Sequence, residues 1–150
     1  MTIHVELVSQ EGRVFEERAA DMVLVPATEG IMGVLPRHSP VLTTLDFGEL
    51  VIRKGNAEER FVIYGGVVDV RPGKIVLLAD TAASAHALDM QAAEEARERA
   101  REMLAESLPE DKRRDAALQL RRAELAIRVS RKLKQGPSMM RIIEDEESGD

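Results

Sequence analysis

Residues 29–40 read Glu-Gly-Ile-Met-Gly-Val-Leu-Pro-Arg-His-Ser-Pro and lie between two apolar runs, 22–25 and 41–45. This stretch holds two glycines and two prolines. Glycine adopts backbone angles that other residues avoid, and proline fixes its own φ, so the composition specifies one loop path. It favours a rigid connection between two strands. The same loop could also be a contact surface, and the stretch alone leaves both interpretations open.

Short strands are predicted on both sides of this loop. Residues 3–7 alternate apolar and polar side chains, which is typical of a half-buried strand. Further short apolar runs follow up to residue 80, and Gly- or Pro-containing turns separate them. Eight or so short strands without a helical period predict an all-β sandwich or barrel.

A different pattern begins at Asp89. No glycine or proline follows until Pro109, and Asp89 is a good N-cap for a helix. A second helix is predicted from about Asp111 to Lys134, and the short connection predicts antiparallel packing. The facing residues are largely alanine, which buries little area, so we expect a marginally stable hairpin.

The fold class is therefore α+β, with an N-terminal antiparallel β-sandwich followed by a C-terminal two-helix antiparallel hairpin. We expect the sandwich over residues 1–86, the hairpin over 87–135, and an acidic, disordered tail over 136–150.

The composition argues against catalysis. There is no cysteine, which excludes disulfides, cysteine metal sites and thiol catalysis. The three histidines are far apart, so no metal site is predicted. Phosphate-binding glycine loops, dinucleotide fingerprints and nucleophile elbows are absent from the sequence. The acidic pairs Glu16-Glu17 and Glu58-Glu59 read as solvated turns. We expect a chain that is not an enzyme.

The sequence also shows no secretion signal and no apolar run long enough to span a bilayer. We expect a soluble protein of the cytoplasm with no direct bilayer insertion.

Charge is distributed unevenly. The net charge is −6, yet residues 112–141 contain ten basic and two acidic side chains. Such a block favours an acidic partner, either nucleic acid or an acidic protein loop. No aromatic residue lies among these basic residues, which disfavours stacking on single strands. A nucleic-acid-binding adaptor that uses the basic helix 112–134 stays as the alternative function.

Several motifs resemble those of the epsilon subunit of the rotary F-type ATP synthase. They are Glu-Gly-x-x-Gly-Val-Leu-Pro-x-His-Ser-Pro (29–40), Gly-Gly-Val-Val-Asp-Val (65–70), Ile-Val-Leu-Leu-Ala-Asp (75–80), Leu-Asp (88–89) and Arg-Arg-Ala-Glu-Leu-Ala (121–126). Together they cover the chain from about residue 3 to 134. The first two, in that order and spacing, are fairly specific.

The resemblance implies a non-catalytic subunit that couples proton-driven rotation to ATP synthesis at the cytoplasmic face of the inner membrane. Its implied partners are the gamma subunit and the c-subunit rotor ring, and in the inhibited state the beta and alpha subunits. The hairpin would inhibit ATP hydrolysis by extending into the catalytic head. The implied rotor-ring contacts are Glu29, Ile31, Arg37 and His38, although the family often has Glu at the position of Ile31. The implied head contacts are Arg121, Arg122, Arg128, Arg131 and Lys132.

Some members of this family bind ATP on the hairpin through the motif Ile/Leu-Asp-x-x-Arg-Ala. Here Leu88 and Asp89 fit, but Ala92 stands where the arginine belongs. Loss of an arginine that pairs with phosphate lowers the affinity for ATP by about one to two powers of ten. No cofactor is expected, and ATP is expected at most as a weak regulatory ligand on Asp89, Arg99 and Arg122.

Overall fold

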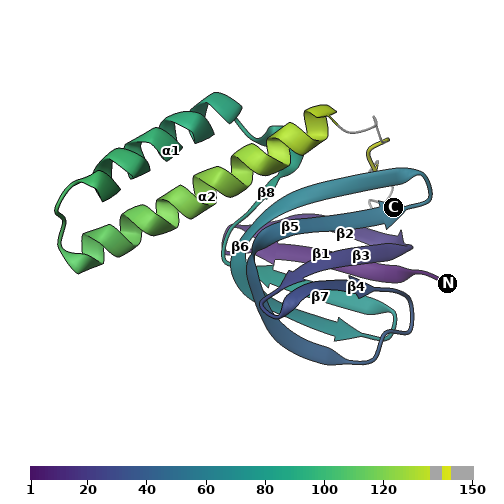
Figure 1. The fold of residues 1–150 in the computed structure, drawn as a ribbon. Helices are drawn as coiled ribbons and strands as arrows, with labels where there is room; N and C mark the ends of the chain where they lie inside the picture. Colours follow the sequence, from purple (N-terminus) through teal and green to yellow (C-terminus); the bar gives the residue numbers. More distant parts are fainter. Residues whose placement is uncertain (136–139, 143–150) are drawn as a thin grey trace. The chain divides into compact units, whose positions relative to one another are not determined.

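The computed structural model describes residues 1–135 and 140–142. Two compact units form, a β domain (residues 1–84 with 140–142) and a helical hairpin (residues 85–135) (Figure 1). The strands are β1 (Ile3–Ser9), β2 (Gly12–Ala20), β3 (Met22–Ala27), β4 (Gly30–Val34), β5 (Val41–Lys54), β6 (Ala57–Arg71), β7 (Lys74–Ala79) and β8 (Ala82–Ser84). The helices are the short 3-10 helix η1 (Ala85–Ala87), α1 (Met90–Ala105) and α2 (Glu110–Gln135).

The alternation of the first strand places its apolar residues in the core. Ile3, Val5 and Leu7 are fully buried, while His4 and Glu6 between them are half-buried. Successive side chains of a strand point to opposite faces, so one face of β1 builds the core and the other meets solvent. The predicted strand at residues 3–7 is confirmed.

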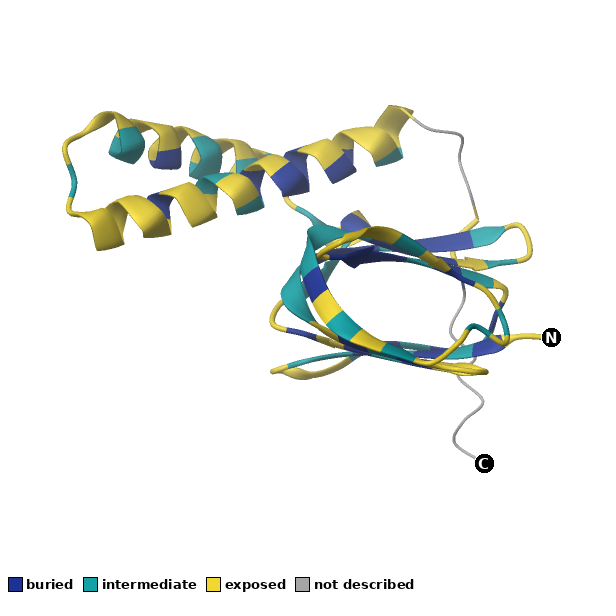
Figure 2. Cartoon of the chain, turned by 60° about the horizontal axis from the view of Figure 1, so that its bottom comes forward, coloured by how far each residue is buried: buried dark blue, intermediate teal, exposed yellow. Residues whose placement is uncertain are grey.

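The sheet follows the order β2-β1-β7-β6-β5-β3-β4, with β8 also paired to β6. The long strands β5 and β6 pair along their whole length and curve from one layer to the other (Figure 1). The two layers enclose the buried residues, as Figure 2 shows. The predicted sandwich and helical hairpin are confirmed. One strand pair differs from the antiparallel prediction, because β1 runs parallel to β7.

Two glycines allow β6 to change layers. Gly65 and Gly66 have φ of 86° and 135°, angles that other residues rarely adopt. A Cβ on Gly66 would lie 2.2 Å from the carbonyl oxygen of Leu78. Before these glycines β6 pairs with β8, and after them it pairs with β7. The Gly-Gly pair is therefore a structural requirement of the sandwich.

The acidic pairs of β2 and β6 are not solvated turns, so that prediction was wrong. Glu17, Glu58 and Glu59 lie within strands and are buried. Lys54 donates to Glu17 over 2.8 Å, and each of the two β6 carboxylates accepts from arginine. Buried carboxylates need such partners, and the sequence does not show which distant cations supply them.

The helical hairpin has the antiparallel arrangement that the short connection predicts (Figure 1). The Asp89 side chain accepts from the backbone N–H of Ala92 over 3.1 Å, which caps α1 as predicted. Ala100 on α1 is buried, and so are Ala116 and Ala123 on α2.

Part of the predicted tail lies on the β domain. Residues 140–142 contact the strand β6, and Ile142 belongs to the hydrophobic core. The prediction of a disordered tail does not hold for these three residues, because they complete a strand edge and bury an isoleucine. The rest of the predicted tail, residues 136–139 and 143–150, lies outside the described residues.

Candidate functional site

The stretch 29–40 is not the single loop that the sequence predicted, because its residues 30–34 form strand β4, with a turn at each end. The first turn, Thr28-Glu29, joins β3 to β4 and is fixed to β5. The N–H of Thr28 donates to the carbonyl of Thr44 over 3.1 Å, and the two threonine hydroxyls lie 2.8 Å apart. Glu29 in this turn is exposed, and Ile31 on β4 is 78% exposed.

The second turn contains the other two residues predicted to contact a rotor ring. The N–H of His38 donates to the carbonyl of Leu35 over 3.2 Å, which closes a turn with Pro36 and Arg37 at its centre. Arg37 has φ of 69°, an angle that costs energy for any residue with a Cβ. The ring Nδ1 of His38 lies 2.7 Å from the carbonyl oxygen of Ser39. Both turns thus have a defined backbone.

The four predicted ring contacts do not form one cluster. Glu29 and Ile31 lie at the start of β4, whereas Arg37 and His38 follow its end. All four side chains are at least partly accessible at these two turns. A partner that contacts all of them must therefore cover both ends of β4.

An exposed apolar strip crosses the outer face of three neighbouring strands. Leu42 on β5, Val67 on β6 and Leu78 on β7 are 72%, 38% and 53% exposed. Val67 pairs directly with Leu78 and with Thr44, which shares a face of β5 with Leu42. Contiguous exposed apolar side chains commonly mark an interaction surface. The sequence interpretation did not identify this apolar strip, because it forms only through the strand register that brings β5, β6 and β7 together.

Basic residues line a groove within the helical hairpin. The groove has a volume of about 390 Å³, and all its lining residues come from α1 and α2. They are Arg97, Arg101, Glu124, Ile127, Arg128, Arg131, Lys132 and Gln135. Five of these eight side chains are cationic, so the groove is suited to an anionic group.

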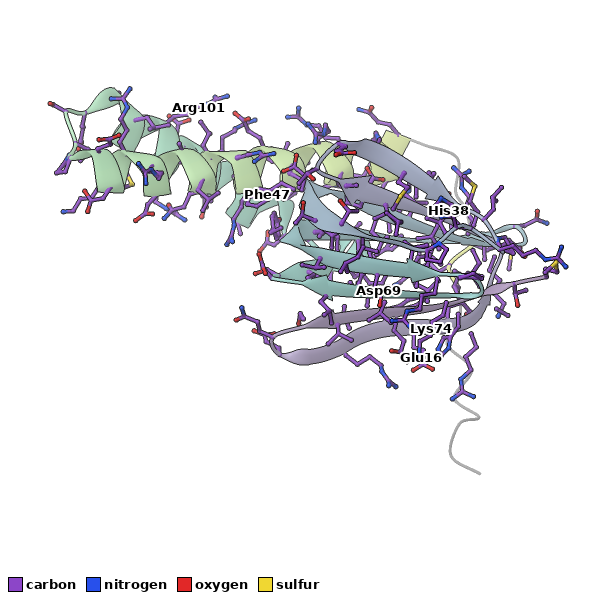
Figure 3. All side chains as sticks on the ribbon, turned by 90° about the horizontal axis from the view of Figure 1, so that it is seen from below. Glu16, His38, Phe47, Asp69, Lys74 and Arg101 are labelled. Carbon is purple, nitrogen blue, oxygen red and sulfur yellow. The ribbon has the colours of Figure 1, made fainter. Side chains whose placement is uncertain are left out.

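Only some of the hairpin residues that were predicted to contact the catalytic head line this groove. Arg128, Arg131 and Lys132 do, whereas Arg121 and Arg122 are not among the lining residues on the described part of the chain. Arg97 and Arg101 were missed, although their i,i+4 spacing places them on one face of α1. The Nε atom of Arg97 is buried and has no hydrogen-bond partner among the residues that the structure describes. Figure 3 labels Arg101 on the hairpin.

The predicted nucleotide residues do not converge on the groove either. Asp89 already caps α1 through Ala92, and Arg99 is exposed on the same helix. Neither of them is among the described residues that line the groove, and Arg122 is not among them either. The arrangement nearest to a phosphate site is therefore Arg97, Arg128 and Arg131.

A cluster on β1 and β2 has the residue types of a metal site. One ligand atom each from His4, Glu6 and Glu16 lies within 4.8 Å of the others. Arginines already occupy the Glu16 carboxylate, with Arg13 Nη1 at 2.6 Å and Arg18 Nε at 3.2 Å. The hydrogen bond from Arg18, together with Arg13 and His4, lowers the pKa of Glu16 below its ordinary value. The cluster is an ion-pair network across β1 and β2, and Figure 3 labels Glu16 in it.

Among residues 1–135 and 140–142, no helix is long and apolar enough to cross a membrane.

Comparison with known proteins defines the class of this fold. Residues 2–85 match the family model described as the ATP synthase delta/epsilon chain, beta-sandwich domain. The ATP synthase epsilon chain of Alkalilimnicola ehrlichii is 46% identical over 105 residues, covering 69% of this chain and 74% of that one. The epsilon chain of Dehalococcoides mccartyi is 36% identical over 138 residues, covering 91% and 98%.

Solved structures share the fold. A chain of the mitochondrial ATP synthase of Euglena gracilis aligns with a TM-score of 0.67 at 24% identity, covering 89% of this chain and 79% of that one. A chain of the central stalk and c-ring structure from Tetrahymena thermophila aligns with a TM-score of 0.56 at 14% identity, covering 87% and 97%. The protein belongs to the epsilon-chain family of ATP synthase.

Proposed function

We propose that this chain is the epsilon subunit of the central stalk of an F-type ATP synthase, with no catalytic centre of its own. The observation that carries this proposal is the match of residues 2–85 to the family's β-sandwich, extended by 36% identity over 91% of the chain. In that complex the subunit couples proton-driven rotation to ATP synthesis. It lies peripherally at the cytoplasmic face of the inner membrane.

The two turns around β4 are the proposed contact with the c-subunit rotor ring. Glu29 and Ile31 offer a carboxylate and an apolar side chain on one turn, and Arg37 and His38 offer polar groups on the other. A surface that transmits torque should not flex, and the hydrogen bonds at both turns hold the backbone in place. Rigidity and contact, left as alternatives by the sequence, are therefore compatible.

The apolar strip is the proposed contact with the gamma subunit. Exposure of these three apolar side chains to water is unfavourable in an isolated chain, because burying a leucine side chain lowers the free energy. A second subunit of the stalk that covers Leu42, Val67 and Leu78 would supply that burial.

The helical hairpin is proposed to inhibit ATP hydrolysis when it extends into the catalytic head of alpha and beta subunits. The basic side chains of α2 support this role, because they would face an acidic loop of the beta subunit. Arg121, Arg122, Arg128, Arg131 and Lys132 are the proposed contacts. The alanine contacts between α1 and α2 are compatible with rearrangement, since each buries little area.

ATP is proposed as a weak regulatory ligand of the hairpin. The basic groove supports a phosphate contact through Arg97 and Arg128, while Ala92 at the motif's arginine position weakens it. Titration calorimetry of the full chain with ATP measures this affinity. If no heat of binding is measured at millimolar ATP, then ATP is not a ligand of the hairpin.

The experiment that tests the main proposal is reconstitution with a gamma subunit and a c ring. We expect the full chain to co-purify with both at physiological salt, and an Arg37→Ala/His38→Ala variant to lose ring binding while gamma binding persists. A chain that binds neither subunit, but binds duplex DNA tightly at the same salt, would support the nucleic-acid alternative instead.

A further inference from the structure

The edge of β6 is only partly covered by the strands of the β domain. One side of β6 pairs with β5 along residues 57–70, but on the other side β8 reaches only residues 61–63. The backbone of residues 57–60 therefore presents an open strand edge. Such edges bind extended segments readily.

Residues 140–142, which we name the C-terminal anchor, occupy this edge. Met140 forms a parallel bridge with Ala57, and the N–H of Glu58 donates to the Met140 carbonyl over 2.8 Å. The bridge continues the sheet by one residue. The anchor thus covers the part of the edge that β8 leaves open.

An ion pair fixes the anchor in register. Arg141 Nε and Nη2 donate to the two carboxylate oxygens of Glu59 over 2.8 and 3.0 Å. The Glu59 side chain is only 2% exposed, so this bidentate pair satisfies a buried carboxylate. The Glu59 hydrogen bond also raises the pKa of the Arg141 guanidinium.

The third residue of the anchor enters the core. Ile142 is 7% exposed and lies in the same buried cluster as the core residues of β1 and β5. Burial of an isoleucine side chain is favourable, so the anchor combines backbone, ionic and apolar contacts. Three different kinds of contact within three residues indicate a specific docked segment.

The anchor follows the C-terminal end of α2 closely in the sequence. Only four residues, 136–139, separate Gln135 from Met140. An extended chain spans about 3.3–3.6 Å per residue, so this link reaches about 18 Å at most. The docked anchor therefore limits how far the end of α2 can move from Met140.

We infer that the C-terminal anchor restrains the helical hairpin, and that residues 140–142 must leave the β6 edge before the hairpin extends. This inference rests on the proposed inhibitory function of the hairpin. Extension of α2 into a catalytic head carries its C-terminal end away from the β domain, and the short link does not permit that while Met140, Arg141 and Ile142 are docked. The anchor favours the state of the subunit that does not inhibit hydrolysis.

The test uses the full chain with Arg141→Gln, which removes the bidentate pair. Arg71→Gln is the matched control, because Arg71 is an exposed arginine of β6, the strand that carries Glu59, and its ion pair with Asp69 lies at the surface. Ile142→Ala is a second variant that leaves Arg141 in place. Two quantities are measured, amide hydrogen exchange of the free chain and inhibition of ATP hydrolysis by the head assembled with the gamma subunit and this chain.

We expect Arg141→Gln and Ile142→Ala to lower protection of the Glu58 amide at least about tenfold, with no change at Val62 within the same strand. Both variants should inhibit hydrolysis at about five- to tenfold lower concentration than the unmodified chain. Arg71→Gln should change neither quantity.

Two outcomes would overturn the inference, and they differ from failure of the proposed function. Unchanged Glu58 protection in both variants would show that Arg141 and Ile142 do not hold the segment. Lost protection with unchanged inhibition would show that the anchor docks without restraining the hairpin, while the inhibitory function stands. If neither the unmodified chain nor its variants inhibit, the inhibitory function fails and the restraint fails with it.

Discussion

At the residue scale, two positions combine an energetically unfavourable feature, a strained backbone angle or a buried charge, with a specific contact. Arg37 holds a backbone angle that favours glycine, yet it places a guanidinium at a turn that is proposed to meet the rotor ring. Glu59 keeps a carboxylate almost fully buried, and Arg141 supplies its partner from 82 residues further along the chain. Such costs are retained in proteins where a contact requires them, which makes these residues informative to substitute.

Arg37 allows the backbone cost to be separated from the contact. Arg37→Ala removes the guanidinium but keeps a Cβ at φ of 69°, whereas Arg37→Gly removes both. We expect Arg37→Gly to be more stable than Arg37→Ala by about 1 kcal/mol, because left-handed backbone costs about 1–2 kcal/mol for a residue with a Cβ. Urea unfolding followed by circular dichroism measures the difference. Equal unfolding free energies would mean that the turn relaxes in Arg37→Ala. Both variants lack the guanidinium, so both should bind the rotor ring equally weakly.

At the element scale, the long strands β5 and β6 build the sandwich and the helices form a separate, less buried unit. The change of layer in β6 depends on Gly65 and Gly66, where a side chain would meet the backbone of β7 or the Asp80 carboxylate. The hairpin relies on alanines between α1 and α2. The two units therefore differ in how much apolar area each element buries, and this predicts a difference in local stability.

Gly66→Ala tests the requirement for glycine in β6. The added Cβ would lie 2.2 Å from the Leu78 carbonyl oxygen, so the strand must shift as well as hold φ of 135°. Gly12→Ala is the control, because Gly12 has φ of 119° with open space around it. We expect a loss of about 1–3 kcal/mol for Gly12→Ala from backbone strain, and a further loss of about 1–3 kcal/mol for Gly66→Ala from overlap. Similar unfolding free energies for the two variants would show that the overlap is relieved without cost.

Hydrogen exchange distinguishes the stability of the two units. Amides of α1 should exchange at least about tenfold faster than those of β5 and β6, since Ala100 is the one residue of α1 that is buried and helical stability depends on packing. Native-state exchange of the full chain at low denaturant measures this. If α1 and the long strands exchange at the same rate, the hairpin does not open independently and the expectation of a marginal hairpin fails.

At the scale of the whole molecule, local patterns predicted the elements, and contacts between distant segments were not predictable. The alternation of Ile3, Val5 and Leu7 indicated β1, and the capping geometry of Asp89 indicated α1, because both depend on neighbouring residues alone. The parallel pairing of β1 with β7 joins segments far apart in sequence, and alternation carries no information on strand partners. The Glu59–Arg141 pair was missed for the same reason, since an acidic pair close after the Gly55-Asn56 turn looks like a solvated one.

The apolar strip is the feature of the whole molecule that most directly tests its place in a larger assembly. Leu42 is 72% exposed, so Leu42→Lys should change the unfolding free energy by less than about 0.5 kcal/mol. If the gamma subunit covers the strip, a buried lysine should weaken binding at least about tenfold, because an ammonium loses its hydration there. Leu118→Lys is the matched control, an exposed leucine on α2 outside the strip. Binding to a gamma subunit and urea unfolding are measured on both variants. Loss of affinity in Leu42→Lys alone, at unchanged stability, is the expected result, whereas equal affinities would place the stalk contact on another face of the β domain.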